Sequence, residues 1–348
     1  MIDRLTEKYY YVLEYIGAFC KKINKEMSLI RKKKEVILMA VKREDFTFTS
    51  TTGDLDIHAI SWKPEDGKVK CVLQLVHGMA EHMNRYEGMA RYFAERGIAV
   101  YGADHIGHGE SINKDYPLGY FGTKNKAGRT FVDDAKLLTN IAKNENPGVP
   151  YILFGHSMGS FVARAYSALY GNELDAVIYC GTGGPPSFVA PLLGLMAAPL
   201  QIGAGKREAN LLNKLSFCTF NNKTDKRTEF DWLSVNEENV DTYIADPLCG
   251  FCFSKHGFYD LTTLLQFVTR KSTFKMIPKE LPILMIAGAE DPVGEYGLAI
   301  RRIFALLKLT GHKKAEKKLF DGSRHEIHNE KNNEEVYETV YKFIKKNI

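Results

Sequence analysis

The sequence places a serine between two glycines in the segment Gly155-His156-Ser157-Met158-Gly159. The apolar run Tyr151-Ile152-Leu153-Phe154 precedes this segment, and a helical pattern over residues 161–170 follows it. A strand, a Gly-x-Ser-x-Gly turn and a helix in that order predict a nucleophile elbow. The turn leaves no room for a Cβ on either flank, so both flanks are glycine. It presents the serine hydroxyl beside a helix N-terminus, whose dipole favours developing negative charge.

Two further residues could complete a catalytic triad with Ser157. A serine hydroxyl becomes a nucleophile only when a base takes its proton, and a carboxylate must hold that base in the correct tautomer. Asp291 and His325 follow Ser157 in the chain, and each comes just after an apolar strand-like run. Serine, acid and histidine in this order at strand ends predict a Ser-His-Asp triad.

Both partners of the serine have a rival nearby in the chain. Glu290 competes with Asp291 for the role of the acid, but Asp291 is favoured because the residue before Pro292 is held extended. His328 competes with His325 for the role of the base, and His325 is favoured because it lies in the loop where the strand ends.

A second backbone donor is needed to bind the oxyanion of a tetrahedral intermediate. We expect it in the loop that follows the first long buried strand, residues 72–76. His77-Gly78 begins that loop, and the glycine lets the backbone approach closely. The N–H groups of Met79 and Met158 are therefore predicted to form the oxyanion hole.

The pattern from residue 46 onward predicts an α/β fold. Apolar strand-like runs alternate with helical patterns, which implies a mostly parallel sheet flanked by helices. Residues 185–275 break this alternation, and the distance of 134 positions from Ser157 to Asp291 also demands an insertion. We therefore expect a core over residues 46–184 and 276–348, with an inserted, mainly helical cap over residues 185–275.

The cap is expected to begin with an apolar lid helix over residues 188–202, followed by irregular chain to about residue 274. No charged residue occurs between positions 176 and 205, but several prolines there exclude a membrane span. Cap helices commonly cover a cleft, and three apolar side chains of the lid helix are predicted to line the substrate pocket: Leu192, Leu195 and Met196.

Residues 1–45 are expected to form an N-terminal extension with an amphipathic helix, because apolar residues recur at spacings of three and four. Its longest uncharged piece, Tyr15–Cys20, is too short for a signal peptide or a membrane span. The helix is expected to pack on the body, or to precede an ordinary start at Met39. Peripheral membrane contact through residues 1–38 is the alternative.

Charge and cysteine content restrict the function further. Residues 1–38 hold nine Lys or Arg and five Asp or Glu, so four of the five net positive charges lie there and the body is not a nucleic-acid binder by charge. The six cysteines are scattered, and no secretory signal precedes them, so we expect reduced thiols and a cytoplasmic protein. Neither Cys249-Gly-Phe-Cys252 nor Asp104-His105-x-x-His108 completes a metal-ligand set, so no metal or cofactor is expected.

The motifs together resemble the monoacylglycerol lipase and lysophospholipase group of α/β-hydrolases, which is also described as serine aminopeptidase-like. The resemblance covers about residues 44–346. It is carried by His77-Gly78-Met79-Ala80-Glu81-His82 with Arg85-Tyr86, Asp104-His105-x-Gly107-His108-Gly109-x-Ser111, the elbow, Asp291 and His325. It implies a serine esterase that acts on single-acyl-chain lipids such as monoacylglycerols or lysophospholipids. The glycine pair that usually follows the nucleophile is Gly159-Ser160 here, and residues 1–38 have no counterpart.

Two other functions stay open on the same fold. An aminopeptidase or amide hydrolase would need acidic cap residues to hold a free α-amino group, and Asp231, Glu237 and Glu238 are available. A non-catalytic binding protein is the second alternative, although such proteins usually lose a triad residue and this chain keeps all three.

Overall fold

The computed structural model describes residues 40–122, 128–184, 199 and 205–348. An eight-stranded sheet forms the centre, in the order β1-β2-β4-β3-β5-β6-β7-β8. The pairs β1–β2 and β2–β4 are antiparallel, and all other neighbours are parallel. The strands are β1 (Val41–Thr49), β2 (Asp56–Pro64), β3 (Cys71–Val76), β4 (Ile98–Ala103), β5 (Tyr151–His156), β6 (Ala176–Cys180), β7 (Ile283–Gly288) and β8 (Ala315–Phe320).

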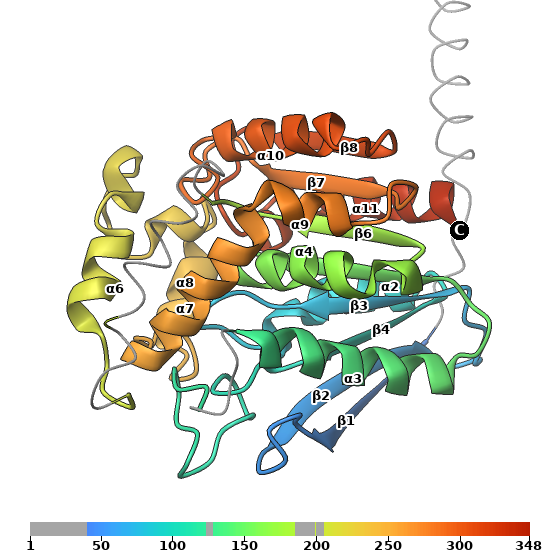
Figure 1. Ribbon diagram of the computed structural model, residues 1–348, viewed down its shortest axis with the longest axis horizontal. Coiled ribbons are helices and arrows are strands. Elements are labelled where there is room, and N and C mark those ends of the chain that lie inside the picture. The colour runs from blue at the N-terminus through green and yellow to red at the C-terminus, as the bar shows by residue number, and fades with distance from the viewer. Residues whose placement is uncertain (1–39, 123–127, 185–198, 200–204) are drawn as a thin grey trace, which may run out of the picture. The chain divides into compact units, whose positions relative to one another are not determined.

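Helices cover both faces of the sheet (Figure 1). One face packs against α2 (Glu87–Ala94) and α11 (Asn333–Asn347), and the other packs against α3 (Arg129–Glu145), α4 (Met158–Tyr170) and α10 (Leu298–Leu309). Every residue of the central strands β3, β5, β6 and β7 is buried, because each lies between two helical layers. Their near-continuous apolar sequences are typical of parallel strands buried on both faces. The predicted α/β architecture is therefore confirmed.

The cap follows β6, and its described part is mainly helical, as expected; the helices also occupy residues 210–276, where the sequence showed no regular pattern. They are α6 (Asn210–Phe217), η5 (Phe220–Lys223), η6 (Asp231–Leu233), α7 (Glu237–Ala245), α8 (Lys255–Thr269) and α9 (Lys271–Met276), where η marks a 3-10 helix. Helix α8 shows how such a helix is specified. The Ser254 hydroxyl caps its first turn by accepting a hydrogen bond from Gly257 N, and its buried residues Asp260, Leu264 and Val268 recur at a helical spacing of four.

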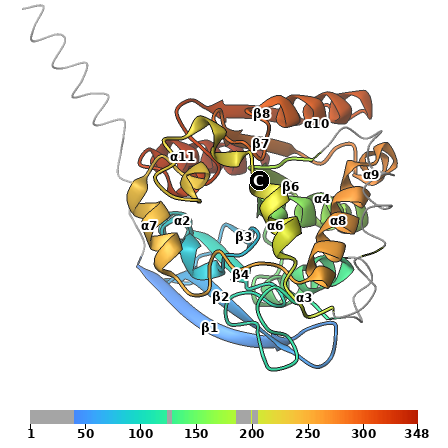
Figure 2. The ribbon, with the colours of Figure 1, turned by 90° about the vertical axis from the view of Figure 1, so that its left-hand side faces the viewer.

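Figure 2 shows α6, α7 and α8 arranged around the ends of the central strands. Three short 3-10 helices complete the description: η1 (Met83–Tyr86), η2 (Gly171–Glu173) and η7 (Ile327–Asn329). None of the described helices is both long and apolar enough to cross a membrane.

The first strand corrects one predicted boundary. Strand β1 begins at Val41, so residues 41–45 belong to the sheet and not to the N-terminal extension. Charged side chains hide this strand from a hydrophobicity pattern, because its alternate residues point to solvent at the edge of the sheet. The rest of the predicted extension, residues 1–39, and the predicted lid helix over residues 188–202 lie outside the described residues, apart from Pro199.

Candidate active site

The predicted nucleophile lies in a strained turn between β5 and α4. Ser157 has φ 53° and ψ −119°, a conformation that side-chain-bearing residues rarely adopt. A Cβ on Gly155 would lie 2.2 Å from the Gly159 carbonyl oxygen, and a Cβ on Gly159 would lie 2.1 Å from that of Val76. Both glycines are therefore required by the backbone path.

The predicted acid and base form a hydrogen-bonded pair at the ends of β7 and β8. His325 Nδ1 lies 3.0 Å from Asp291 Oδ1, and both residues are almost fully buried. Burial disfavours the charged imidazolium. The Asp291 carboxylate outweighs burial, with help from Glu326 and Glu81, and raises the pKa of His325 above its ordinary value of 6.5. The rival acid Glu290 is exposed, and none of its side-chain contacts reaches His325 among the described residues.

The loop after β3 approaches the elbow as predicted. A Cβ on Gly78 would lie only 3.1 Å from Ser157 Cβ, so the backbone of residues 78–79 passes close to the serine. The Met79 N–H has no acceptor among the described residues, and Met158 begins α4, so its N–H has no acceptor within the helix. Glu81 Oε1 accepts a hydrogen bond from Gly78 N at 2.6 Å and so fixes this loop.

One cavity of about 880 Å³ lies beneath the cap, and its volume is within the range of small-molecule sites. Ser157, His325, Met79 and Met158 lie on its core side. The cap contributes mostly aromatic and aliphatic side chains. They include Phe217, Phe220, Phe230, Trp232, Leu233, Phe251, Phe258, Leu261 and Leu265. The arrangement places a candidate nucleophile and base in the wall of a largely apolar chamber.

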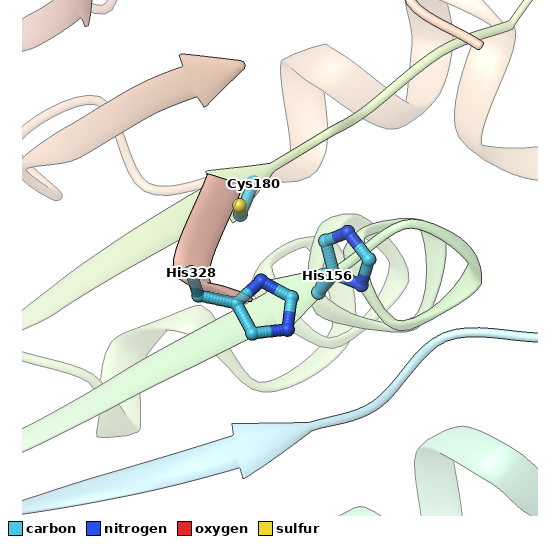
Figure 3. A group of neighbouring side chains, drawn as sticks. All are labelled: His156, Cys180 and His328. Carbon is cyan, nitrogen blue, oxygen red and sulfur yellow. The ribbon is translucent and has the colours of Figure 1, made fainter. Parts of the chain in front are cut away.

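The rival base His328 lies apart from Asp291 and is fully buried. Its ring stacks on Tyr86 with centroids 4.6 Å apart, and it lies beside His156 and Cys180 (Figure 3). Burial and the neighbouring His156 lower the pKa of His328 to about 3, so the ring is neutral. It does not line the cavity.

The side chains of His156, Cys180 and His328 lie close enough together to be considered as ligands of a metal ion. His156 Nδ1 lies 3.1 Å from the Tyr86 hydroxyl, and its Nε2 lies 3.2 Å from the His325 carbonyl oxygen. Because both nitrogens of His156 have partners, only His328 and Cys180 could each offer a free ligand atom, and two ligands are fewer than a zinc site uses.

The loop that contains Asp104, His105 and His108 is held by internal hydrogen bonds. The Asp104 carboxylate accepts from Met83 N at 2.7 Å and from Glu110 N at 3.0 Å, and it lies 2.9 Å from His58 Nδ1. Burial lowers the pKa of His108 to about 3 and that of His105 well below its ordinary range. These side chains shape the loop next to His77, whose ring and carbonyl oxygen lie within hydrogen-bond distance of His105.

Comparisons with known proteins agree with this geometry. The family described as "Serine aminopeptidase, S33" (Hydrolase_4) matches residues 67–332, which is more than half of the chain. The chain belongs to this family. The predicted resemblance, the α/β-hydrolase fold and the prediction of a serine hydrolase are thereby confirmed.

Similar proteins include lipases and an esterase. A monoacylglycerol lipase of Mycolicibacterium smegmatis is 27% identical over 312 residues, which span 88% of this chain and 99% of the relative. A monoglyceride lipase of Homo sapiens is 26% identical over 273 residues, 77% of this chain and 79% of the relative. A solved carboxyl esterase from Bacillus coagulans, in complex with glycerol, is 30% identical with a TM-score of 0.80, and the match covers 88% of this chain and 98% of the esterase.

The structure brings Ser157, His325, Met79 and Met158 together around one cavity and bonds Asp291 to His325. Leu192, Leu195 and Met196 lie outside the described residues. The sequence reading missed the cap aromatics, above all Trp232, whose ring lies 5.3 Å from that of His325. The only sequence signal for it is a tryptophan inside a polar stretch of the insertion, next to Asp231.

Proposed function

We propose that this chain hydrolyses carboxylic esters of single-acyl-chain lipids, monoacylglycerols or lysophospholipids, through an acyl-enzyme. The observation that carries the proposal is that His325, hydrogen-bonded to the buried Asp291, lines the same largely apolar cavity as Ser157. An apolar chamber of this size can shield one acyl chain from water. The lipase and esterase relatives support the same class of substrate.

In the proposed reaction, His325 Nε2 takes the proton of the Ser157 hydroxyl while the oxygen attacks the ester carbonyl. The negative charge of the tetrahedral intermediate is stabilised by the N–H groups of Met79 and Met158 and by the N-terminus of α4. His325 then returns the proton to the leaving alcohol. Water attacks the acyl-enzyme by the same route and releases the fatty acid. Asp291 holds the His325 tautomer throughout and stabilises the imidazolium.

The aminopeptidase alternative depends on an acid that can hold a free amino group inside the site. The three acids considered for this role do not line the cavity. The Asp231 carboxylate accepts hydrogen bonds from Arg227 N at 2.6 Å and Thr228 N at 3.1 Å, and Glu237 and Glu238 are exposed on α7. Among the described cap residues, Glu229 is the one acid that lines the cavity, and its side chain is exposed, whereas most of the cap side chains in the lining are apolar. This balance favours an ester of an apolar acid over a peptide with a charged terminus.

The test is the Ser157→Ala variant assayed with a fluorophosphonate probe and with a panel of acyl esters and aminoacyl amides. We expect the probe not to label the variant and turnover to fall on the order of a million-fold, because the whole triad acts through this oxygen. Undiminished labelling would remove Ser157 from the mechanism. Faster hydrolysis of aminoacyl amides than of esters by the native protein would instead support the aminopeptidase.

A further inference from the structure

One buried carboxylate joins the cap to the loop that contains His325. Glu330 is 1% exposed, and four donors converge on its two oxygens. The Ser234 hydroxyl donates at 2.6 Å, Val235 N at 3.1 Å and Asn236 N at 3.2 Å, all from the cap segment that leads into α7. Arg324 N, next to His325, donates from the core at 2.9 Å. Glu330 thus satisfies backbone groups on both sides of the cap–core boundary.

The neighbours of Glu330 strengthen this junction. The Arg324 guanidinium donates to the carbonyl oxygens of Asp231 at 2.8 Å and Ser234 at 3.1 Å. Glu326 N donates to Leu233 O at 2.7 Å. The residues on either side of His325 are therefore both bonded to the same short cap segment, residues 231–234.

That cap segment carries the aromatic side chain that touches the proposed base. Trp232 is 8% exposed, its ring lies 5.3 Å from the His325 ring, and it lines the cavity. On its other side it packs against Phe217 and Phe220, with ring centroids 5.7 and 5.0 Å away. A substrate chain in the cavity would contact this aromatic wall. Trp232 would then lie in contact with both the substrate and His325.

We propose that Glu330 is a positioning residue that acts through Trp232: it fixes residues 231–236 on the loop of His325, so that the Trp232 ring holds the imidazole toward Ser157. This inference rests on the proposed function, because it assumes that His325 is the base. Glu330 neither lines the cavity nor contacts His325 directly. Its effect must therefore pass through the cap segment and the loop.

A glutamine at position 330 keeps the size of the side chain but not its acceptors. Four donors face the two carboxylate oxygens, and the amide NH₂ of a glutamine would point at least one donor against another. The cap segment would then shift or lose bonds without a cavity being created. Because small displacements of reacting groups cost up to about 100-fold in rate, a loss of about tenfold in kcat is expected for Glu330→Gln.

The experiment is a double-mutant cycle with Glu330→Gln and Trp232→Ala, using a soluble acetate ester and a dodecanoate ester. Glu330→Gln alone should lower kcat for the acetate ester about tenfold with little change in KM, and slow fluorophosphonate labelling by the same factor. In the Trp232→Ala background the same change should cost less than about twofold, since the contact through which Glu330 acts is gone. Glu335→Gln is the matched control and should leave both rates unchanged. Glu335 is exposed on α11, and its carboxylate accepts a hydrogen bond from Lys318.

Thermal unfolding of each variant separates positioning from folding. If Glu330→Gln does not stay folded, Ser234→Ala removes only one of the four donors and should produce a smaller loss in the same direction. Equal losses in both backgrounds, or full kcat in Glu330→Gln, would overturn the inference. The proposed function fails separately, if Ser157→Ala keeps its activity.

Discussion

The nucleophile elbow and the part of the cap over residues 231–239 both lie next to His325, but different forces hold them there. The elbow is fixed by backbone sterics, because glycine at 155 and 159 allows contacts that a Cβ would block at 2.1–2.2 Å. The cap segment is fixed by side-chain hydrogen bonds to residues about ninety positions later in the chain. The first is a local property of five residues. The second exists only after the cap has folded onto the core.

The largest effect on activity should come from a change in the core, at Asp291. Asp291→Asn should lower kcat about 10⁴-fold with the fold intact, because the amide no longer fixes the tautomer in which His325 Nε2 accepts a proton. Glu290→Gln is the control and should keep near-native activity, since Glu290 is exposed. The measurement is steady-state hydrolysis of a soluble ester by both variants. Greater damage from the Glu290 change would reverse the assignment of the acid.

The elbow itself can be broken with one methyl group. Gly159→Ala would place a Cβ 2.1 Å from Val76 O, against backbone that cannot move without disturbing the sheet. We expect a loss of more than about 4 kcal/mol in the free energy of unfolding, measured in urea, as for other severe core disruptions. Gly88→Ala in α2 is the control, because its Cβ would lie 3.8 Å from its nearest neighbour and alanine favours helix by about 1 kcal/mol. Equal stability of the two variants would show that the elbow tolerates a side chain.

This difference explains what the sequence could predict. The buried His325–Asp291 pair, the order of strands and helices after β2, and the close approach of Gly78 to Ser157 all follow from short apolar runs and the residues that end them. Parallel strands bring their carboxyl ends to one edge of the sheet, so local patterns are enough to locate residues far apart in the chain. Residues 41–45 of strand β1 escaped prediction because four of these five residues are charged and the strand lies at the edge of the sheet.

The cap could not be predicted in the same way. Glu330 follows His325 in a polar stretch that no periodicity marks, and its four donors come from both the cap and the core. A buried carboxylate looks like a surface residue until its partners are known, because glutamate is usually exposed. Trp232 was missed for the same reason, since its neighbours in space come from α6, η5 and the loop of His325.

The pH dependence of hydrolysis tests the charges that surround His325. The proposed base must be neutral, so kcat/KM should be full above the pKa of His325 and fall about tenfold per pH unit below it. Because that pKa is raised, the midpoint should lie above 6.5. Glu326→Gln removes a negative charge beside His325 and should move the midpoint to lower pH, while Glu335→Gln should not. A native midpoint below 6.5 would contradict the electrostatic role of Asp291.

The smallest effect is expected from the N-terminal residues, which lie outside both regions compared here. Every described residue that lines the cavity lies at or after Gly78, and the first described strand begins at Val41. We therefore expect a chain that begins at Met39 to hydrolyse a soluble acetate ester at close to the full-length rate. Loss of activity or solubility in the shortened chain would make residues 1–38 part of the hydrolase core.

Membrane contact through residues 1–38 is tested with the same pair of proteins. This segment holds four of the five net positive charges, and each Lys or Arg near an anionic surface contributes about 1 kcal/mol to binding. If the segment lies on membranes, the full-length chain should co-sediment with anionic vesicles at low salt, release them at high salt, and lose the interaction when it begins at Met39. If neither chain binds the vesicles, the segment either packs on the body or precedes an ordinary start at Met39. That is the outcome we expect.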